Sequence, residues 1–230
     1  MEWRHRRYPD AIEVLMIRYD TSFQRLAFCL AALAGFVDAI GFLGSGGLFV
    51  SFMSGNSTRL AIGITEAKTL AFAAAALIGL FVAGVFLNII VTEKVTVAHR
   101  KVVAISGVAA LLLCAACCKW TGSDVASTGF LCVAMGASNT IFRRDGEVSV
   151  GVTYMTGTLV KLGHRLADAA LGGSRTAWIP YLLLWLALVF GGILGAASYS
   201  WSQDASLGFA AAFALALIPV TQRITATLKS

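Results

Sequence analysis

The chain has 230 residues, of which 58% are hydrophobic and only 13% are charged. A soluble domain carries roughly 45–50% apolar and about 25% charged residues, and a mean hydropathy of +0.79 would leave large apolar patches facing water. The same composition excludes a disordered chain and a disulfide-stapled secreted fold. The sequence therefore predicts an all-α, polytopic membrane protein.

Six apolar runs are candidates for crossing the membrane, because a transmembrane helix needs about 20 apolar residues. The first run contains a single charge, Asp38, and the other runs are bounded by charged or polar residues. In chain order the runs are Leu26 to about Phe49, Thr69–Thr92, Val102–Cys118, Val125–Phe142, a run within Thr176–Trp201 and a run within Ala205–Gln222.

The distribution of Lys and Arg predicts the orientation, because positive residues are retained on the cytoplasmic side. With six spans and a cytoplasmic N-terminus, all of the 18 Lys and Arg residues except Arg59, Lys68 and Lys119 fall inside. The first 25 residues hold several arginines and no apolar stretch of signal-peptide type, so no cleaved signal is expected. We expect a plasma (bacterial inner) membrane protein with both termini cytoplasmic. The net charge of +6 then reflects topology, and no nucleic-acid partner is expected beside the lipid bilayer.

The two halves of the chain share a motif. The run Val50–Gly55 (VSFMSG) recurs as Val152–Gly157 (VTYMTG), and upstream Gly35–Asp38 (GFVD) is matched by Gly136–Asn139 (GASN). Three spans per half is an odd number, so the second half enters the membrane in the opposite orientation, as an inverted-topology repeat. We therefore expect two three-span repeats, 26–119 and 120–222, flanked by cytoplasmic segments 1–25 and 223–230.

The repeated motifs lie in segments rich in glycine and hydroxyl side chains, which we interpret as broken or re-entrant. Irregular backbone at membrane depth survives only inside protein or around a wet cavity. One alternative is that these segments are complete spans, which gives eight spans and places Lys94, Arg100 and Lys101 outside, against the charge rule. Another is that the motif glycines only permit close helix packing.

The residues Gly35-x-x-Asp38-x-x-Gly41-Phe42, followed by Phe52-Met53-Ser54-Gly55-Asn56, resemble the YoaK family of bacterial and fungal membrane proteins. The resemblance covers roughly residues 22–225, and the Met-Ser-Gly-Asn element is its most specific part. It implies a six-span integral membrane protein, loosely associated with transport. The family supplies no established substrate or catalytic residues, so the resemblance assigns no residue a role.

Asp38 is the only acidic residue deep within a span. A charge at the bilayer centre costs about 2.5–3.5 kcal/mol, so such residues usually line a cavity, pair with another group or relay a proton. Asp38 is interpreted as a proton- or cation-coupling residue or a contact for a substrate amine. The alternative is a structural acid that caps the broken segment or pairs with Arg59. Its counterpart Asn139 carries no charge.

The expected solute site lies at the interface of the two repeats. Arg59 and Lys161 occupy matching positions, where they either close around an anionic substrate or extend to opposite membrane interfaces. Neutral hydroxyl and amide groups orient a ligand at a lower desolvation cost than charges. The predicted site residues are Asp38, Asn139, Ser54, Gly55, Asn56, Arg59, Thr156, Gly157, Thr158 and Lys161.

The sequence favours neither a metal site nor an enzyme. Cys114, Cys117 and Cys118 share a helical face, but a cysteine pair without a second pair or paired histidines is a weak zinc signal. No motif of a hydrolase, metalloprotease or nucleotide-binding enzyme occurs, so we expect no cofactor and no catalytic residues. Gly191, Gly192 and Gly195 form a close-packing face, within the monomer or at the seam of a homodimer.

These observations favour a transporter or facilitator of a small solute, either uncoupled or coupled to protons or cations through Asp38, in which one half rocks against the other. A channel needs a continuous polar file, and the second, third and sixth runs are almost entirely aliphatic and Phe. A channel is therefore the weaker alternative. A non-transporting membrane scaffold or partner protein is a further one.

Overall fold

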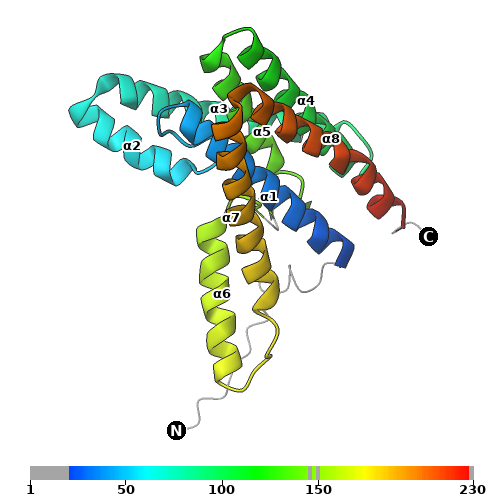
Figure 1. The fold of residues 1–230 in the computed structure, drawn as a ribbon. Helices are drawn as coiled ribbons and strands as arrows, with labels where there is room; N and C mark the ends of the chain where they lie inside the picture. The colour runs from blue at the N-terminus through cyan, green and yellow to red at the C-terminus, as the bar shows by residue number, and fades with distance from the viewer. Residues whose placement is uncertain (1–20, 145–146, 149–150, 228–230) are drawn as a thin grey trace.

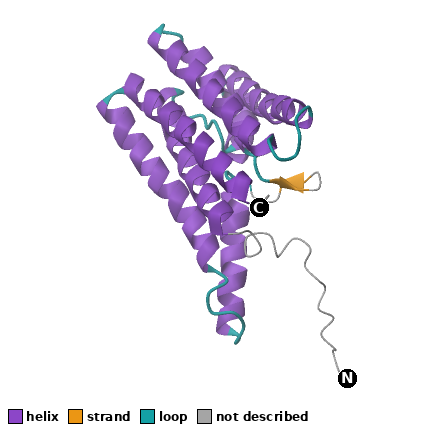
Figure 2. Cartoon of the chain, turned by 90° about the vertical axis from the view of Figure 1, so that its right-hand side faces the viewer, coloured by secondary structure: helices purple, strands orange, loops and turns teal. Residues whose placement is uncertain are grey.

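The computed structural model describes residues 21–144, 147–148 and 151–227, and Figure 1 shows them as a bundle of helices. The predicted all-α class is confirmed, apart from a short antiparallel hairpin of β1 (Arg143–Arg144) and β2 (Glu147–Val148), visible at the edge of the bundle in Figure 2. Most of the predicted N-terminal segment lies outside the described residues. The helices are α1 Thr21–Gly44, α2 Met53–Glu66, α3 Lys68–Glu93, α4 Arg100–Trp120, α5 Asp124–Ser138, α6 Met155–Ala170, α7 Ile179–Trp201 and α8 Gln203–Thr227.

Among the described residues, five helices are long and apolar enough to cross a membrane: α1, α3, α4, α7 and α8. The predicted end of the first span, at about Phe49, is wrong, since the helix ends five residues earlier. The helix ends at Gly44, because Gly46 and Gly47 adopt positive φ angles of 71° and 106° and turn the chain out of the helix.

The predicted end of the fourth span, Phe142, is also wrong, because α5 ends at Ser138. The side chains of Asn139 and Thr140 donate to the carbonyl oxygens of Met135 and Ala137, and so satisfy acceptors at the helix terminus. With 15 residues, α5 is about 22 Å long. It is shorter than the bilayer core of about 30 Å.

Two shorter helices, α2 and α6, follow the repeated motifs. α2 has 14 residues and α6 has 16, which corresponds to about 21 Å and about 24 Å. A single residue, Ala67, joins α2 to α3, and α2 packs against α3 as α6 packs against α7. In Figure 1, α2 and α6 begin near the middle of the bundle and lead away from it in different directions.

The helices of one half pack against those of the other in matching pairs. α1 packs on α7 and α8, while α5, its counterpart in the second half, packs on α3 and α4. The remaining pairs between the halves, α1 with α5 and α4 with α8, join counterparts to each other. In Figure 1, α1 crosses α7 near the centre and α4 lies beside α8. The packing scheme is therefore unchanged when the two halves are exchanged.

Glycines bring the paired helices into backbone contact. A Cβ atom at Gly35 of α1 would overlap the carbonyl oxygen of Leu188 in α7, and one at Gly136 of α5 would overlap that of Phe81 in α3. The reverse contacts also match, because Cβ atoms at Gly191 and Gly84 would overlap the carbonyl oxygens of Ala32 and Val133. The glycine face of α7 thus packs within the monomer at Gly191.

Candidate functional site

The segment after α1 folds back along that helix and is held by two side chains. Oδ1 of Asp38 accepts hydrogen bonds from the backbone N–H groups of Val50 (2.9 Å) and Ser51 (2.8 Å). Asn56, fully buried, accepts from the N–H of Phe49 at 2.9 Å and donates to its carbonyl oxygen at 2.6 Å. Since Asp38 lies six residues before the end of α1, the segment returns about 9 Å along the helix axis. α2 then starts at that depth.

The second half repeats part of this arrangement. Oδ1 of Asn139 accepts hydrogen bonds from the backbone N–H (3.4 Å) and the hydroxyl (3.0 Å) of Thr153, the residue that corresponds to Ser51. Thr158, which corresponds to Asn56, is buried and donates to the carbonyl oxygen of Tyr154. In each half, the Asp or Asn therefore holds the first residues of the motif of the same half.

The two arrangements differ in charge and in access. Asn139 is 1% exposed, whereas Asp38 lines a groove of about 360 Å³ between α1 and α7. The aromatic rings of Phe42 and Phe49 line the same groove. Its other walls are apolar, formed by Gly35, Ala39, Leu43, Leu188, Val189, Gly192 and Ala196. The carboxylate of Asp38 therefore lines an accessible groove, whereas its neutral counterpart Asn139 is buried.

Arg59 does not pair with Asp38 in the part of the chain that the structure describes. Its guanidinium lies over the rings of Phe42 and Phe49, with Cζ 5.7 Å and 5.9 Å from the two ring centroids. Lys161, at the matching position of α6, is exposed. The remaining predicted site residues are Ser54, Thr156 and Gly157, which are exposed, and Gly55, which is half-buried.

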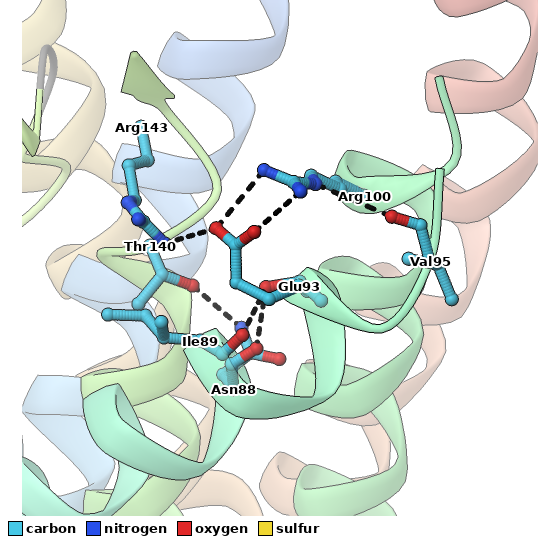
Figure 3. A network of polar contacts seen from close by, with 8 residues as sticks. Asn88, Ile89, Glu93, Val95, Arg100, Thr140 and Arg143 are labelled. Atoms are coloured by element: carbon cyan, nitrogen blue, oxygen red, sulfur yellow. Dashed lines mark hydrogen bonds and ion pairs between the residues drawn. The ribbon is translucent and has the colours of Figure 1, made fainter. Parts of the chain in front are cut away.

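Sequence reasoning missed Asn88, a polar residue inside the apolar run of α3. Its side chain is buried and donates to the carbonyl oxygen of Ala137 (3.0 Å) and to the hydroxyl of Thr140 (2.8 Å), as Figure 3 shows for Thr140. It thereby ties α3 to the turn where α5 ends and the second broken segment begins. A search for charged residues alone passes over an amide in such a run.

A network of charges lies at the same end of α3. Glu93 forms ion pairs with Arg100 at the start of α4 and with Arg143 of β1, the latter at 2.9 Å (Figure 3). Nearby, Nζ of Lys101 donates to the carbonyl oxygen of Ile141 at 3.1 Å. These contacts join the ends of α3, α4 and α5 on the side where the charge distribution predicts the cytoplasm.

The cysteines are dispersed. Cys114 and Cys117 are exposed on α4, whereas Cys132 is buried in α5 and donates to the carbonyl oxygen of Leu77. Within the described ranges, no three His, Cys, Asp or Glu side chains are grouped so as to hold a metal ion.

Five helices that are long and apolar enough to cross a membrane are typical of a polytopic integral membrane protein. More particularly, the chain belongs to the family described as "Protein of unknown function (DUF1275)", whose model matches residues 26–220. This confirms the resemblance to YoaK, a member of that family. The chain is 35% identical over 182 residues to the UPF0700 transmembrane protein RA0705 of Rhizobium meliloti (strain 1021), covering 79% of this chain and 78% of the relative. No solved structure matches the chain.

Proposed function

We propose that this protein is a carrier for a small solute, with its binding site in the groove beside Asp38. One comparison carries the proposal. Asn139 accepts the N–H of Thr153 with a neutral amide, at the position where Asp38 accepts the N–H of Ser51, so this backbone contact does not require a charge. A carboxylate at this depth costs about 2.5–3.5 kcal/mol, and it lines an accessible groove. The charge of Asp38 is not needed for this backbone contact, and it lies where a solute has access. This combination supports a role in binding or coupling.

The proposed carrier is built from two inverted repeats of three spans each. The matching helix pairs α1–α7 and α5–α3 support a two-fold relation between the halves. In this arrangement α2 and α6 are half-membrane segments that enter from opposite sides, in keeping with their lengths of about 21 Å and about 24 Å. Inverted repeats of this kind operate by rocking one half against the other around a central site.

In the proposed cycle Asp38 changes its protonation state. A proton on the carboxyl group keeps one acceptor oxygen for Val50 and Ser51, so the broken segment stays in place in both states. The carrier thereby couples solute binding to the proton gradient without dismantling its own site.

The test uses proteoliposomes loaded with a pH-sensitive dye and challenged with small amines, carboxylates and sugars. We expect at least one class to move protons in a saturable way with the wild-type chain and not with Asp38→Asn. Asp168→Asn, which removes an exposed carboxylate on α6, is the matched control. Equal proton movement by Asp38→Asn would contradict coupling through Asp38. The absence of any solute flux, together with a co-purifying protein in fixed ratio, would favour the scaffold.

A further inference from the structure

The chemistry of the groove indicates which class of solute it takes. Asp38 is the only charged residue among those that line it, and Phe42 and Phe49 supply the aromatic surface. A negative charge beside aromatic faces complements a cation, which binds to both by electrostatic attraction. An anionic solute would meet the carboxylate, and the guanidinium of Arg59, although it lies over the two rings, is not among the lining residues.

The two rings already bind one cation within the protein. Phe42 and Phe49 lie with their centroids 4.7 Å apart and tilted by 41°, and the guanidinium of Arg59 lies within 6 Å of both centroids. This is the distance at which cation–π attraction operates. The contact shows that these two rings accept a positive group, and the one charge in the groove lining itself is that of Asp38.

The walls of the groove exclude a bare inorganic cation. Such an ion needs several oxygen ligands to replace its water, whereas α7 contributes only aliphatic and glycine residues such as Leu188, Val189 and Gly192. An organic ammonium or phosphonium ion with hydrophobic substituents keeps little hydration to lose and buries its substituents against these walls. The groove volume of about 360 Å³ suits one small organic molecule.

The surroundings of Asp38 contain few groups that titrate. The stretch of α7 between Tyr181 and Tyr199 and that of α8 between Asp204 and Arg223 hold no titratable residue. α5, which packs against α1, carries the buried thiol of Cys132, which donates to the carbonyl oxygen of Leu77, and α2 presents Arg59 over the rings. A proton that competes with a cation in this groove therefore binds at Asp38.

Building on the proposed carrier function, we infer that the groove beside Asp38 binds a lipophilic organic cation and that a proton and this cation compete for the same carboxylate. One occupant leaves as the other binds, so the protein exchanges protons for organic cations across the membrane. The proton released by Asp38 passes to water on the side from which the cation enters.

The binding test compares tetraphenylphosphonium with tetraphenylborate, two ions of closely similar shape and opposite charge. Equilibrium dialysis measures both against the full chain in nanodiscs, with empty nanodiscs subtracted. We expect saturable binding of the phosphonium and none of the borate. We also expect loss of phosphonium binding in Asp38→Asn and its retention in Asp168→Asn. Equal binding of both ions, or retention in a folded Asp38→Asn, would overturn the inference.

A second measurement needs no variant, so it remains decisive if Asp38→Asn does not fold. Phosphonium affinity of the wild-type chain is measured between pH 5 and pH 9. If a proton and the cation compete for one site, the affinity for the phosphonium falls about tenfold for each unit by which the pH is lowered below the pKa of the carboxyl group. A pH-independent affinity would refute the competition.

Flux separates this inference from the proposed function. Phosphonium accumulation in proteoliposomes under an imposed pH gradient supports both ideas. Charge-selective, pH-dependent binding without flux upholds the ligand class and refutes the carrier. Flux of another solute class, without phosphonium binding, upholds the carrier and refutes the ligand class.

Discussion

At the scale of single residues, the two halves hold their broken segments with different side chains. Oδ1 of Asp38 accepts a hydrogen bond from the N–H of Ser51, and Oδ1 of Asn139 accepts one from the N–H of Thr153. Ser51 and Thr153 occupy matching positions in the two broken segments. The amide of Asn139 also donates to the carbonyl oxygen of Met135 at 3.0 Å, which a carboxylate cannot do. Asp38 and Asn139 thus occupy equivalent positions, but only the position of Asp38 accommodates a charged side chain.

This difference predicts opposite outcomes for two exchanges. Asn139→Asp places an ionised oxygen against the Met135 carbonyl at a site that is 1% exposed. We expect a loss of stability of about 3–5 kcal/mol, as for a buried unpaired charge. Asp38→Asn keeps its acceptor oxygen, and we expect it to fold with a stability within about 1 kcal/mol of wild type. Thermal unfolding in detergent compares both variants. An Asn139→Asp variant as stable as wild type would refute the argument.

Asn56 offers a second prediction at this scale, because it satisfies both backbone groups of Phe49 from a fully buried position. Asn56→Ala leaves that N–H and carbonyl unpaired, at about 1–3 kcal/mol for each group. The control is Ser57→Ala, whose exposed hydroxyl only donates to the carbonyl of Met53. We expect clear destabilisation of Asn56→Ala and almost none of Ser57→Ala in unfolding by denaturant. Similar curves for both variants would show that Asn56 does not hold the segment.

At the scale of elements, glycine contacts define which helices form tight pairs. In membranes, packing and close backbone approach replace the hydrophobic drive that joins helices in water. The pairs α1–α7 and α5–α3 both use this device, through Gly35 and Gly136. A backbone carbonyl opposite a glycine cannot rotate away as a side chain can, so these seams do not tolerate added volume.

Gly136→Ala tests the seam between α5 and α3. Its Cβ would overlap the carbonyl oxygen of Phe81, and we expect destabilisation of about 1–3 kcal/mol, the usual cost of overpacking. Gly79→Ala is the matched control, because a Cβ there meets nothing within 4 Å. It is expected to leave stability unchanged or to raise it by up to about 1 kcal/mol through helix propensity. Melting temperatures in detergent distinguish the two. Equal tolerance would contradict the close approach of α5 and α3.

At the scale of the whole molecule, the orientation depends on where the charged ends of the helices lie. The Glu93, Arg100 and Arg143 network joins α3, α4 and β1 at one end of the bundle. Positive residues concentrate on the cytoplasmic side, so we expect this end to face the cytoplasm. The loop between α3 and α4 then lies inside, and the Ala67 turn between α2 and α3 lies outside.

Cysteine labelling tests this topology. Val97 is 76% exposed in the loop between α3 and α4, and Val97→Cys is introduced into a chain whose five native cysteines have been replaced. We expect a membrane-impermeant maleimide to label it only after the cells are opened. Ala67→Cys, in the exposed turn between α2 and α3, is the control, expected to react from outside. External labelling of residue 97 would refute the six-span arrangement and support eight spans.

Several features follow from composition and local pattern alone. Membrane class and helix positions are predictable because each span must be apolar over about 20 residues regardless of its neighbours. The duplicated motif likewise marks both broken segments directly, since Val50–Gly55 and Val152–Gly157 each lead into a short helix. The helices α1 and α5 end before their apolar runs do, because the helix ends depend on glycine φ angles and on side chains that satisfy the last carbonyls.

What the tertiary structure alone decided is which groups meet. Sequence identifies Asp38 as a costly buried charge, but its contact with Val50 and its place on a groove arise only when the segment folds back against α1 and α7. Phe42 and Phe49 look like ordinary apolar residues until folding turns them to that groove. Asn88, inside an apolar run, gains its hydrogen-bond partner only because α5 ends beside α3. Long-range packing of this kind is set by the fit of distant helices, which no local sequence period encodes.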